Sequence, residues 1–165
     1  MTTADESPSQ ELRSTNQSFL GPRTTIRLGA WNVRTMFETS KTAHVIREMQ
    51  NYNLDLLCVS EYRWTGSGRK VTRDGSIIQI SGKGHTHFNG VALIANRQAA
   101  RSLIDWEPIS DKLIIARFAS NYCNLTILQC YAPTNEVEED VKDDFYEQLQ
   151  NTTTSYATDN WRFEC

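Results

Sequence analysis

Three polar residues, Asn32, Glu61 and Tyr131, each close an apolar run of the sequence and could do chemistry there. Sites are often built where strands end, because rigid backbone holds the side chains and the loops leave space beside them. A carboxylate beside buried residues is costly to desolvate unless a cation or hydrogen-bond donors pair with it. Mg²⁺ would pair with Glu61, since it prefers oxygen ligands and commonly uses one or two protein carboxylates. A salt bridge to Arg63 or Arg34 would explain the same carboxylate without a metal.

A second group with possible chemistry lies in the segment "RWTGSGRKVTR", residues 63–73, where basic side chains alternate with two glycines and a tryptophan. Flexible backbone with interleaved positive charge suits the phosphate backbone of a nucleic acid, and Trp64 could stack on a base or wedge into a groove. The alternative is a mobile, solvated loop whose tryptophan covers the core. The basic residues of this segment are Arg63, Arg69, Lys70 and Arg73.

The first half of the chain predicts a strand, a helix and a second strand that would position Asn32 and Glu61. Residues 25–33 form an alternating strand-like run, and residues 39–53 have helical spacing of apolar positions. The continuous apolar run at 54–61 predicts a strand that is covered on both faces. This order is typical of a βαβ unit, so the two strands should be parallel. The expected buried side of the helix consists of Ala43, Ile46 and Met49.

The second half changes character and predicts antiparallel strands followed by a helix. Four further strand candidates are separated by Gly, Asn and Ser, and the last two face each other across the predicted turn "ASNYCN". The acidic run at 136–147 should be the solvated face of a helix, because apolar residues recur in it every four positions. These apolar positions are Val137, Val141, Phe145 and Leu149. The four strand candidates are residues 75–81, 90–96, 111–120 and 122–133.

Composition indicates one globular domain with a basic body. The chain has 165 residues and a net charge of −3, yet residues 21–135 hold fourteen Lys/Arg against eight Asp/Glu. A basic surface is compatible with a polyanionic partner. Residues 1–22 are polar and should form a disordered arm, residues 23–150 the domain, and residues 151–165 a divergent polar tail.

Membrane and secreted classes are excluded by the apolar pattern. No apolar run approaches the roughly 18 residues of a membrane-spanning helix, and the first residues lack the apolar centre of a secretory signal. We therefore expect a soluble, intracellular protein, cytoplasmic or nuclear and not secreted. The cysteines have no metal-site spacing and should be buried free thiols. They are Cys58, Cys123, Cys130 and Cys165.

Four ordered blocks resemble the endonuclease/exonuclease/phosphatase superfamily. Within it they are most similar to the endonuclease domains of non-LTR (LINE-type) retrotransposons and to craniofacial-development-protein-like sequences. The resemblance implies an α/β fold, a four-layer α/β sandwich, and cleavage of phosphodiesters, or in some branches phosphomonoesters, with Mg²⁺ or Mn²⁺. The blocks are "RLGAWNVRTM", "DLLCVSEYRW", "NGVALIAN" and "ILQCYAPT".

Residue by residue, the resemblance assigns roles to the three strand-end residues. Asn32 matches the asparagine that helps place the metal, Glu61 matches the metal ligand, and Tyr131 matches the tyrosine that approaches the scissile phosphate. Arg34 could approach phosphate from the same edge, or be a surface arginine. The retrotransposon-like blocks favour DNA over RNA as the partner, by analogy only.

The same resemblance implies two further blocks that this sequence lacks. Relatives continue into Gly-Asp-Phe-Asn and later Ser-Asp-His, which supply nucleophile positioning, a general base and a phosphate contact. Neither block occurs among the 165 residues, so we expect a C-terminally incomplete sandwich with exposed strand edges. Two hypotheses follow: an impaired Mg²⁺-dependent endonuclease, or an inactive module that binds nucleic acid or self-associates through a sheet edge.

Overall fold

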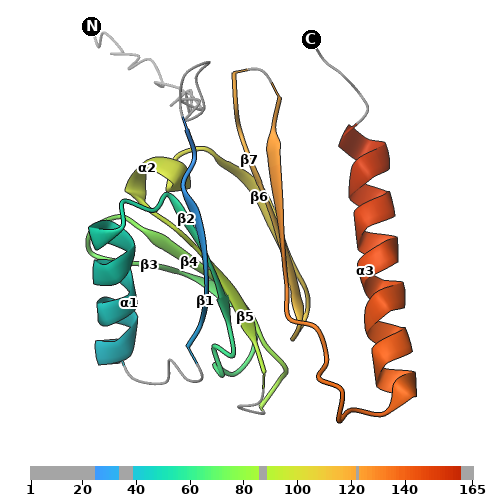
Figure 1. The fold of residues 1–165 in the computed structure, drawn as a ribbon. Coiled ribbons are helices and arrows are strands. Elements are labelled where there is room, and N and C mark those ends of the chain that lie inside the picture. The colour runs from blue at the N-terminus through green and yellow to red at the C-terminus, as the bar shows by residue number, and fades with distance from the viewer. Residues whose placement is uncertain (1–24, 34–38, 86–88, 122, 161–165) are drawn as a thin grey trace, which may run out of the picture.

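The computed structural model describes residues 25–33, 39–85, 89–121 and 123–160. It contains mixed α and β structure, and all six predicted strands are confirmed (Figure 1). Among these residues, no helix is long and apolar enough to cross a membrane. The elements are β1 (Leu28–Asn32), α1 (Thr39–Asn51), β2 (Leu56–Ser60), β3 (Gly68–Val71), β4 (Ile77–Ser81), β5 (Val91–Ala95), α2 (Arg97–Ala100), β6 (Leu103–Ser110), β7 (Leu113–Phe118), β8 (Leu125–Cys130) and α3 (Glu139–Asn160).

The strands form two sheets. The larger has the order β1-β2-β5-β4-β3, and its β1–β2 pair is parallel, as the predicted βαβ unit requires. Its other pairs are antiparallel. The smaller sheet, β6-β7-β8, is antiparallel throughout and includes the predicted hairpin between β7 and β8.

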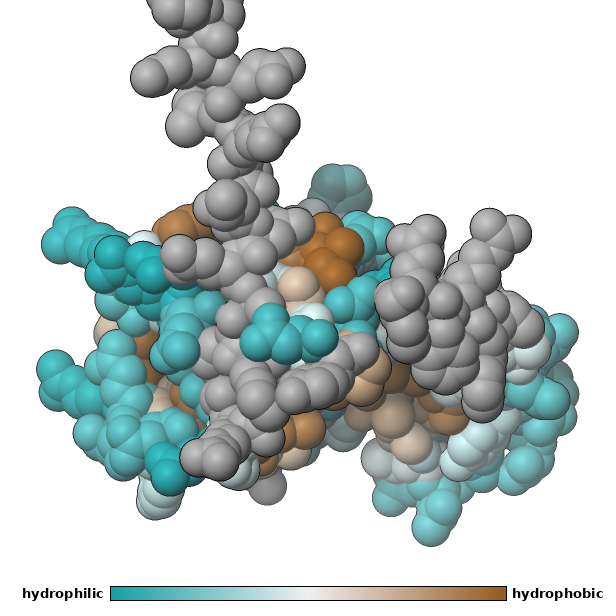
Figure 2. Space-filling view, turned by 90° about the horizontal axis from the view of Figure 1, so that it is seen from above, coloured by the Kyte–Doolittle hydropathy of each residue, from teal (hydrophilic) through white to brown (hydrophobic). Residues whose placement is uncertain are grey.

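The two sheets pack face to face, with a helix on each outer side (Figure 1). Leu56, Leu93 and Ile77 of the larger sheet meet Ala116 and Phe118 of the smaller one in a buried cluster. The opposite face of the larger sheet is covered by α1. Seen from above, apolar residues gather between the hydrophilic flanks of the molecule (Figure 2). Most of the apolar burial, and therefore most of the folding energy, lies in these layers.

The buried face of helix α1 agrees only in part with the face predicted from the sequence. Met49 is 2% exposed, as expected, but Ala43 is exposed and Val45 is the other buried residue, at 5%. The inward face of the helix is therefore displaced from the predicted one. The helix ends at Asn51, and Asn53, with φ 51°, closes it in the left-handed conformation that asparagine tolerates. The closing bond runs from the Leu54 amide to the Met49 carbonyl, 2.9 Å.

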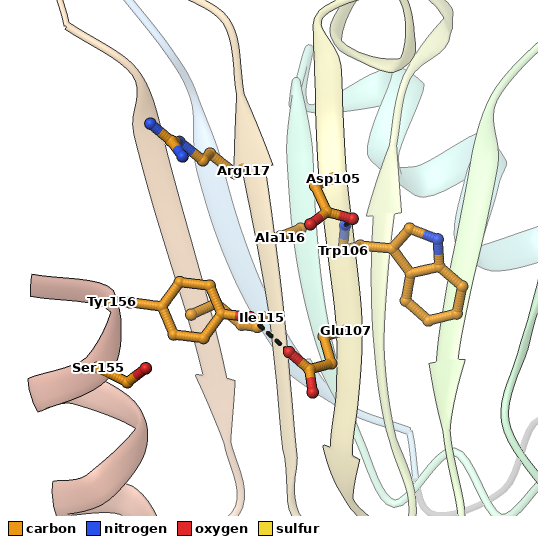
Figure 3. A pocket seen from close by; sticks show the side chains of 8 residues that line it. All are labelled: Asp105, Trp106, Glu107, Ile115, Ala116, Arg117, Ser155 and Tyr156. Carbon is orange, nitrogen blue, oxygen red and sulfur yellow. Dashed lines mark hydrogen bonds between the residues drawn. The ribbon is translucent and has the colours of Figure 1, made fainter. Parts of the chain in front are cut away.

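Helix α3 lies against the outer face of the smaller sheet and runs beyond the predicted boundary at residue 150, to Asn160. Phe145 is buried as predicted, whereas Val141 is 41% exposed, because it lies in the first turn of the helix. Near its end, the Tyr156 hydroxyl donates to Glu107 Oε2 at 2.6 Å. A cavity of about 300 Å³ separates this part of α3 from the strands (Figure 3).

Three elements and two cysteines differ from the predictions. Strands β3 and β6 and the short helix α2 were not predicted, because their exposed or glycine-containing sequences lack a clear periodic pattern. Tertiary pairing supplies what local propensity does not: β3 pairs with β4, and β6 with β7. Cys58 is buried as predicted, but Cys123 and Cys130 are exposed.

Candidate functional site

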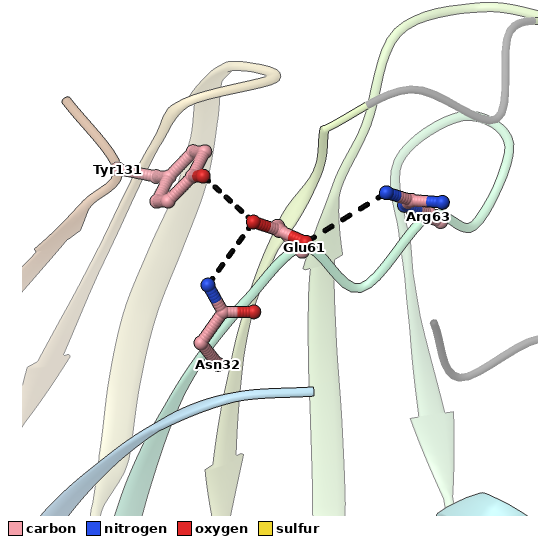
Figure 4. A network of polar contacts seen from close by, with 4 residues as sticks. All are labelled: Asn32, Glu61, Arg63 and Tyr131. Carbon is pink, nitrogen blue, oxygen red and sulfur yellow. Dashed lines mark hydrogen bonds and ion pairs between the residues drawn. The ribbon is translucent and has the colours of Figure 1, made fainter. Parts of the chain in front are cut away.

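The three strand-end residues singled out in the sequence converge on one carboxylate (Figure 4). Glu61 Oε1 accepts a hydrogen bond from Asn32 Nδ2 at 3.0 Å and another from the Tyr131 hydroxyl at 2.7 Å. Its other oxygen, Oε2, lies 3.7 Å from Arg63 Nη2. The salt bridge between Glu61 and Arg63 that the sequence suggested is therefore confirmed, and the metal at Glu61 stays a prediction.

Parallel pairing explains why Asn32 reaches Glu61. The register of β1 and β2 places Asn32 opposite Ser60, the residue immediately before Glu61. Both strands end at the same edge of the sheet, where their last side chains can meet. The Val33 amide continues the pairing by donating to the Ser60 carbonyl at 3.2 Å.

The turn after β2 holds Glu61 in an unusual backbone conformation. Glu61 and Arg63 have φ angles of 56° and 53°. These angles lie in the left-handed region of backbone conformation, which residues other than glycine seldom adopt. Between them, the Tyr62 side chain is fully buried and anchors the turn. The Tyr62 amide donates to the Gly90 carbonyl at 3.1 Å and the Arg63 amide to the Asn89 carbonyl at 2.9 Å. Strained backbone of this kind persists only where the surrounding contacts fix it.

Tyr131 comes from the other sheet, so the site spans both. It follows β8 directly, and its amide donates to the Lys112 carbonyl in the β6–β7 turn at 2.9 Å. The hydrogen bond to Glu61 raises the pKa of the Tyr131 phenol, burial and the charge of Glu61 raise it further, and Arg63 opposes the shift. The phenol is therefore held in its protonated form, as a hydrogen-bond donor at neutral pH.

The donor set at this edge fits a hard cation with one protein carboxylate. Glu61 supplies the carboxylate and Asn32 an amide oxygen, and Mg²⁺ characteristically completes its shell with water and phosphate oxygens. Within the described residues, no group of three or more His, Cys, Asp or Glu side chains is placed to hold a metal. Arg63 pairs with the same carboxylate, so a cation bound by Glu61 would share it with the guanidinium.

The predicted nucleic-acid-binding residues fall into two places. Arg63 lies at the candidate site, while Arg69 and Lys70 belong to β3 and Arg73 to the exposed turn after it. The prediction of one long flexible loop over 63–73 is therefore wrong, because Gly68–Val71 pairs with β4. Arg34 lies outside the described residues.

Trp64 adopts the covering role rather than an open stacking surface. Its ring packs against the buried cluster to which Val45 and Met49 of α1 belong, and it stacks on Tyr62, with centroids 5.8 Å apart. The Lys70 ammonium lies 2.9 Å from the centroid of the indole ring. A cation in this position is attracted by the ring and occupies the surface that a base would need.

Sequence reasoning did not single out the residues that hold the turn. Asn89 and Gly90 accept the two amides of the Glu61 turn, and both have positive φ, 59° and 94°. The dipeptide Asn-Gly is itself a signal for such backbone, and it stood in the third block of the resemblance. Asn89 Nδ2 donates to Asp111 Oδ2 at 3.3 Å. No local sequence pattern indicates this contact.

Fold and site together define a mixed α/β protein with two packed sheets and a single-carboxylate polar site at their common edge. Its sequence is 40% identical over 124 residues to craniofacial development protein 2 of Bos taurus, and 39% identical to that of Tragulus javanicus. The matched segment covers 75% of this chain but 21% of each relative. The chain is thus homologous to part of craniofacial development protein 2 and spans about a fifth of these curated relatives. No protein-family model matches the sequence.

Proposed function

We propose that the protein is a Mg²⁺- or Mn²⁺-dependent phosphodiesterase of the endonuclease/exonuclease/phosphatase type, acting on DNA. The single observation that supports this is the convergence of Asn32, Glu61 and Tyr131, from three strands of two sheets, on one carboxylate. The order of layers, helix, sheet, sheet and helix, is compatible with the four-layer sandwich of that superfamily. The LINE-type retrotransposon endonucleases remain the proposed nearest branch.

The roles of the residues follow from the chemistry of phosphodiester hydrolysis. Attack by water builds negative charge on the phosphate oxygens, and a bound divalent cation supplies Lewis-acid stabilisation of that charge. Glu61 would hold the ion, and the Asn32 amide orients the carboxylate without adding charge. The protonated Tyr131 phenol is a ready donor for a phosphate oxygen. Arg63, beside them, supplies a positive charge that an incoming phosphate can share.

We propose that the 165 residues taken by themselves are less active than a domain with the full superfamily pattern. The Gly-Asp-Phe-Asn and Ser-Asp-His blocks do not occur among them, and groups that act as a unit lose most of their effect when one is missing. The basic side chains Arg63, Arg69, Lys70 and Arg73, with Arg34, would contact the DNA backbone. A nucleic-acid substrate is compatible with a cytoplasmic or nuclear location.

The test is nicking of supercoiled plasmid by the purified chain in Mg²⁺, with EDTA as a control. We expect slow conversion to open circles that EDTA and Glu61→Gln both abolish. Glu136→Gln is the matched control, because it removes one exposed carboxylate outside the site. Absence of nicking by folded protein, or equal nicking by Glu61→Gln, would overturn the proposal.

A second candidate function, an inactive module that self-associates, is favoured by the exposure of β1. The smaller sheet packs over the centre of the larger one, where β8 contacts β2 and β5. On the edge strand β1, Leu28 is 52% exposed and Trp31 is 41% exposed. Sedimentation velocity across protein concentration tests this. Leu28→Lys should weaken association, whereas Val71→Lys on the opposite edge strand, where Val71 is 66% exposed, should not. Equal behaviour of the two variants would contradict an interface at β1.

A further inference from the structure

The candidate site depends on how the two sheets are held relative to each other. Glu61 follows β2 of the larger sheet and Tyr131 follows β8 of the smaller one, so their 2.7 Å contact joins the two layers. Apolar packing alone is non-directional and does not fix such a contact to within a few tenths of an ångström. Directional contacts between the sheets near this edge are therefore expected to position the two side chains.

One directional contact lies directly beneath the site. Gln129 Nε2 donates to the Ser60 hydroxyl at 3.0 Å, between the sheets, and Gln129 is only 9% exposed. Gln129 lies in β8, two residues before Tyr131, which follows the strand, and Ser60 stands one residue before Glu61. The bond therefore ties together the two strand ends that carry the reacting side chains.

A second route joins the same two strand ends through the β6–β7 turn. The Tyr131 amide donates to the Lys112 carbonyl, and the neighbouring Asp111 carbonyl accepts from the Gly90 amide at 3.0 Å. Gly90 and Asn89 in turn accept the amides of the Glu61 turn. These four hydrogen bonds join backbone groups, which side-chain substitutions disturb little, although Asn89 Nδ2 also donates to Asp111 Oδ2. The Gln129 bond, in contrast, is a side-chain contact that a single substitution removes.

We propose that Gln129 is a positioning residue, which through Ser60 holds the Tyr131 phenol against the Glu61 carboxylate. Its effect on the contact between the two side chains is independent of any reaction, and only its effect on catalysis rests on the proposed function. Loss of the bond would free β8 to shift against β2 at this edge, while the apolar centre of the sandwich stays intact.

The chain contains a matched control for this role. Gln79 in β4 is also a buried glutamine, fully inaccessible to solvent, but among the described residues neither its amide nitrogen nor its amide oxygen has a hydrogen-bond partner. It lies opposite Leu93, which packs between the sheets. Replacing either glutamine by methionine keeps the shape of the side chain and removes its hydrogen bonding. Only the change at Gln129 should reach Tyr131.

The experiment follows Tyr131 directly by NMR of protein labelled at the tyrosine ¹³Cζ, with the resonance assigned through Tyr131→Phe. In the wild-type chain, the Tyr131 hydroxyl donates to Glu61 at 2.7 Å. In Gln129→Met, we expect the Tyr131 ¹³Cζ resonance at pH 7 to move toward that of a solvent-exposed tyrosine, because the phenol loses this contact. Gln79→Met should leave the Tyr131 resonance at its wild-type position, and circular dichroism checks that each variant is folded.

Ser60→Ala removes the same hydrogen bond by changing its partner on the other sheet. This variant replaces Gln129→Met in the experiment if Gln129→Met fails to fold. An unchanged Tyr131 ¹³Cζ resonance in the folded variant that lacks this bond would overturn the proposal. Where the wild-type chain nicks plasmid, Gln129→Met should lower kcat about tenfold with KM for DNA unchanged. A chain without nicking activity would contradict the proposed function, whereas the position of the Tyr131 ¹³Cζ resonance would still decide the role of Gln129.

Discussion

The apolar centre of the sandwich and the polar edge that carries Glu61 are built in opposite ways from the same strands. At the centre, Leu93 and Phe118 are at most 1% exposed and the backbone is regular. At the edge, Glu61 and Arg63 have positive φ, and charges and amides replace hydrocarbon contacts. The difference indicates that the two regions contribute to stability with opposite signs: apolar burial at the centre stabilises the fold, and the strained backbone at the edge costs part of that stability.

The largest expected effect is on stability, from Leu93→Ala at the centre. Removing this side chain, which is fully buried between the sheets, should lower the free energy of unfolding by about 2–5 kcal/mol through lost transfer energy and an unfilled cavity. Urea unfolding followed by circular dichroism measures the loss. The Tyr131 ¹³Cζ signal of the molecules that remain folded should be unchanged. A displaced signal would contradict the separation between centre and edge.

The converse effect is expected from Glu61→Gln at the edge. An amide oxygen can still accept from Asn32 and Tyr131, so the free energy of unfolding should change by less than about 1 kcal/mol. Nicking should fall at least about 100-fold, equivalent to about 2.7 kcal/mol of transition-state stabilisation. Urea unfolding and plasmid nicking on the same samples check both parts. A loss of stability comparable to that of Leu93→Ala would place Glu61 among the residues that hold the fold.

A smaller effect is expected at Tyr62, where the two regions meet. Its ring is buried, yet within the part of the chain that the structure describes neither its hydroxyl nor the nearby Thr42 hydroxyl has a partner in hydrogen-bonding geometry. Tyr62→Phe should therefore be neutral or stabilise the protein by up to about 1 kcal/mol, measured by urea unfolding at pH 7. A clear loss of stability would mean that the hydroxyl is bonded in solution.

The pH dependence gives Tyr62 a second signature. Burial raises the pKa of Tyr62, with Thr42 opposing the shift. Because the folded chain disfavours the phenolate, this contribution to stability is complete below the ordinary tyrosine pKa of about 10 and is lost as the pH rises through the folded pKa. Tyr62→Phe should flatten the alkaline fall in unfolding free energy relative to the wild type, measured by urea unfolding from pH 8 upward.

Much of the fold could be predicted because hydrophobic periodicity reports burial. The runs that became β2 and β5 are buried along nearly their whole length, and the sequence identified both. β3 was missed because its Gly68 and exposed Arg69 and Lys70 resemble a loop locally, and only its pairing with β4 makes it a strand. Ala43 was misplaced for a related reason, since periodicity gives the spacing of a helix face but not its rotation against the sheet.

The residues of the candidate site also fall into those that a local sequence pattern identifies and those that it does not. Asn32, Glu61 and Tyr131 could be identified because each is a polar residue at the end of an apolar strand, and strand ends converge. Gln129 and Asn89, which hold their surroundings in place, could not, because their partners lie 69 residues and 22 residues away in the chain. A hydrogen bond between sheets leaves no periodic trace in a single sequence.

The smallest expected effect concerns Lys70, which tests whether the polar edge extends to β3. Lys70→Met keeps the aliphatic stem over Trp64 but removes the cation, so the unfolding free energy should fall by about 0.5–1 kcal/mol. If β3 contacts the DNA backbone, the slope of the logarithm of the DNA affinity against the logarithm of the salt concentration should become smaller by about one unit in this variant. Arg101→Met, which removes an exposed cation after α2, should leave the slope unchanged. Equal slopes in both variants would confine DNA contact to the residues around Glu61 and Arg63, and the edge would end where β3 begins.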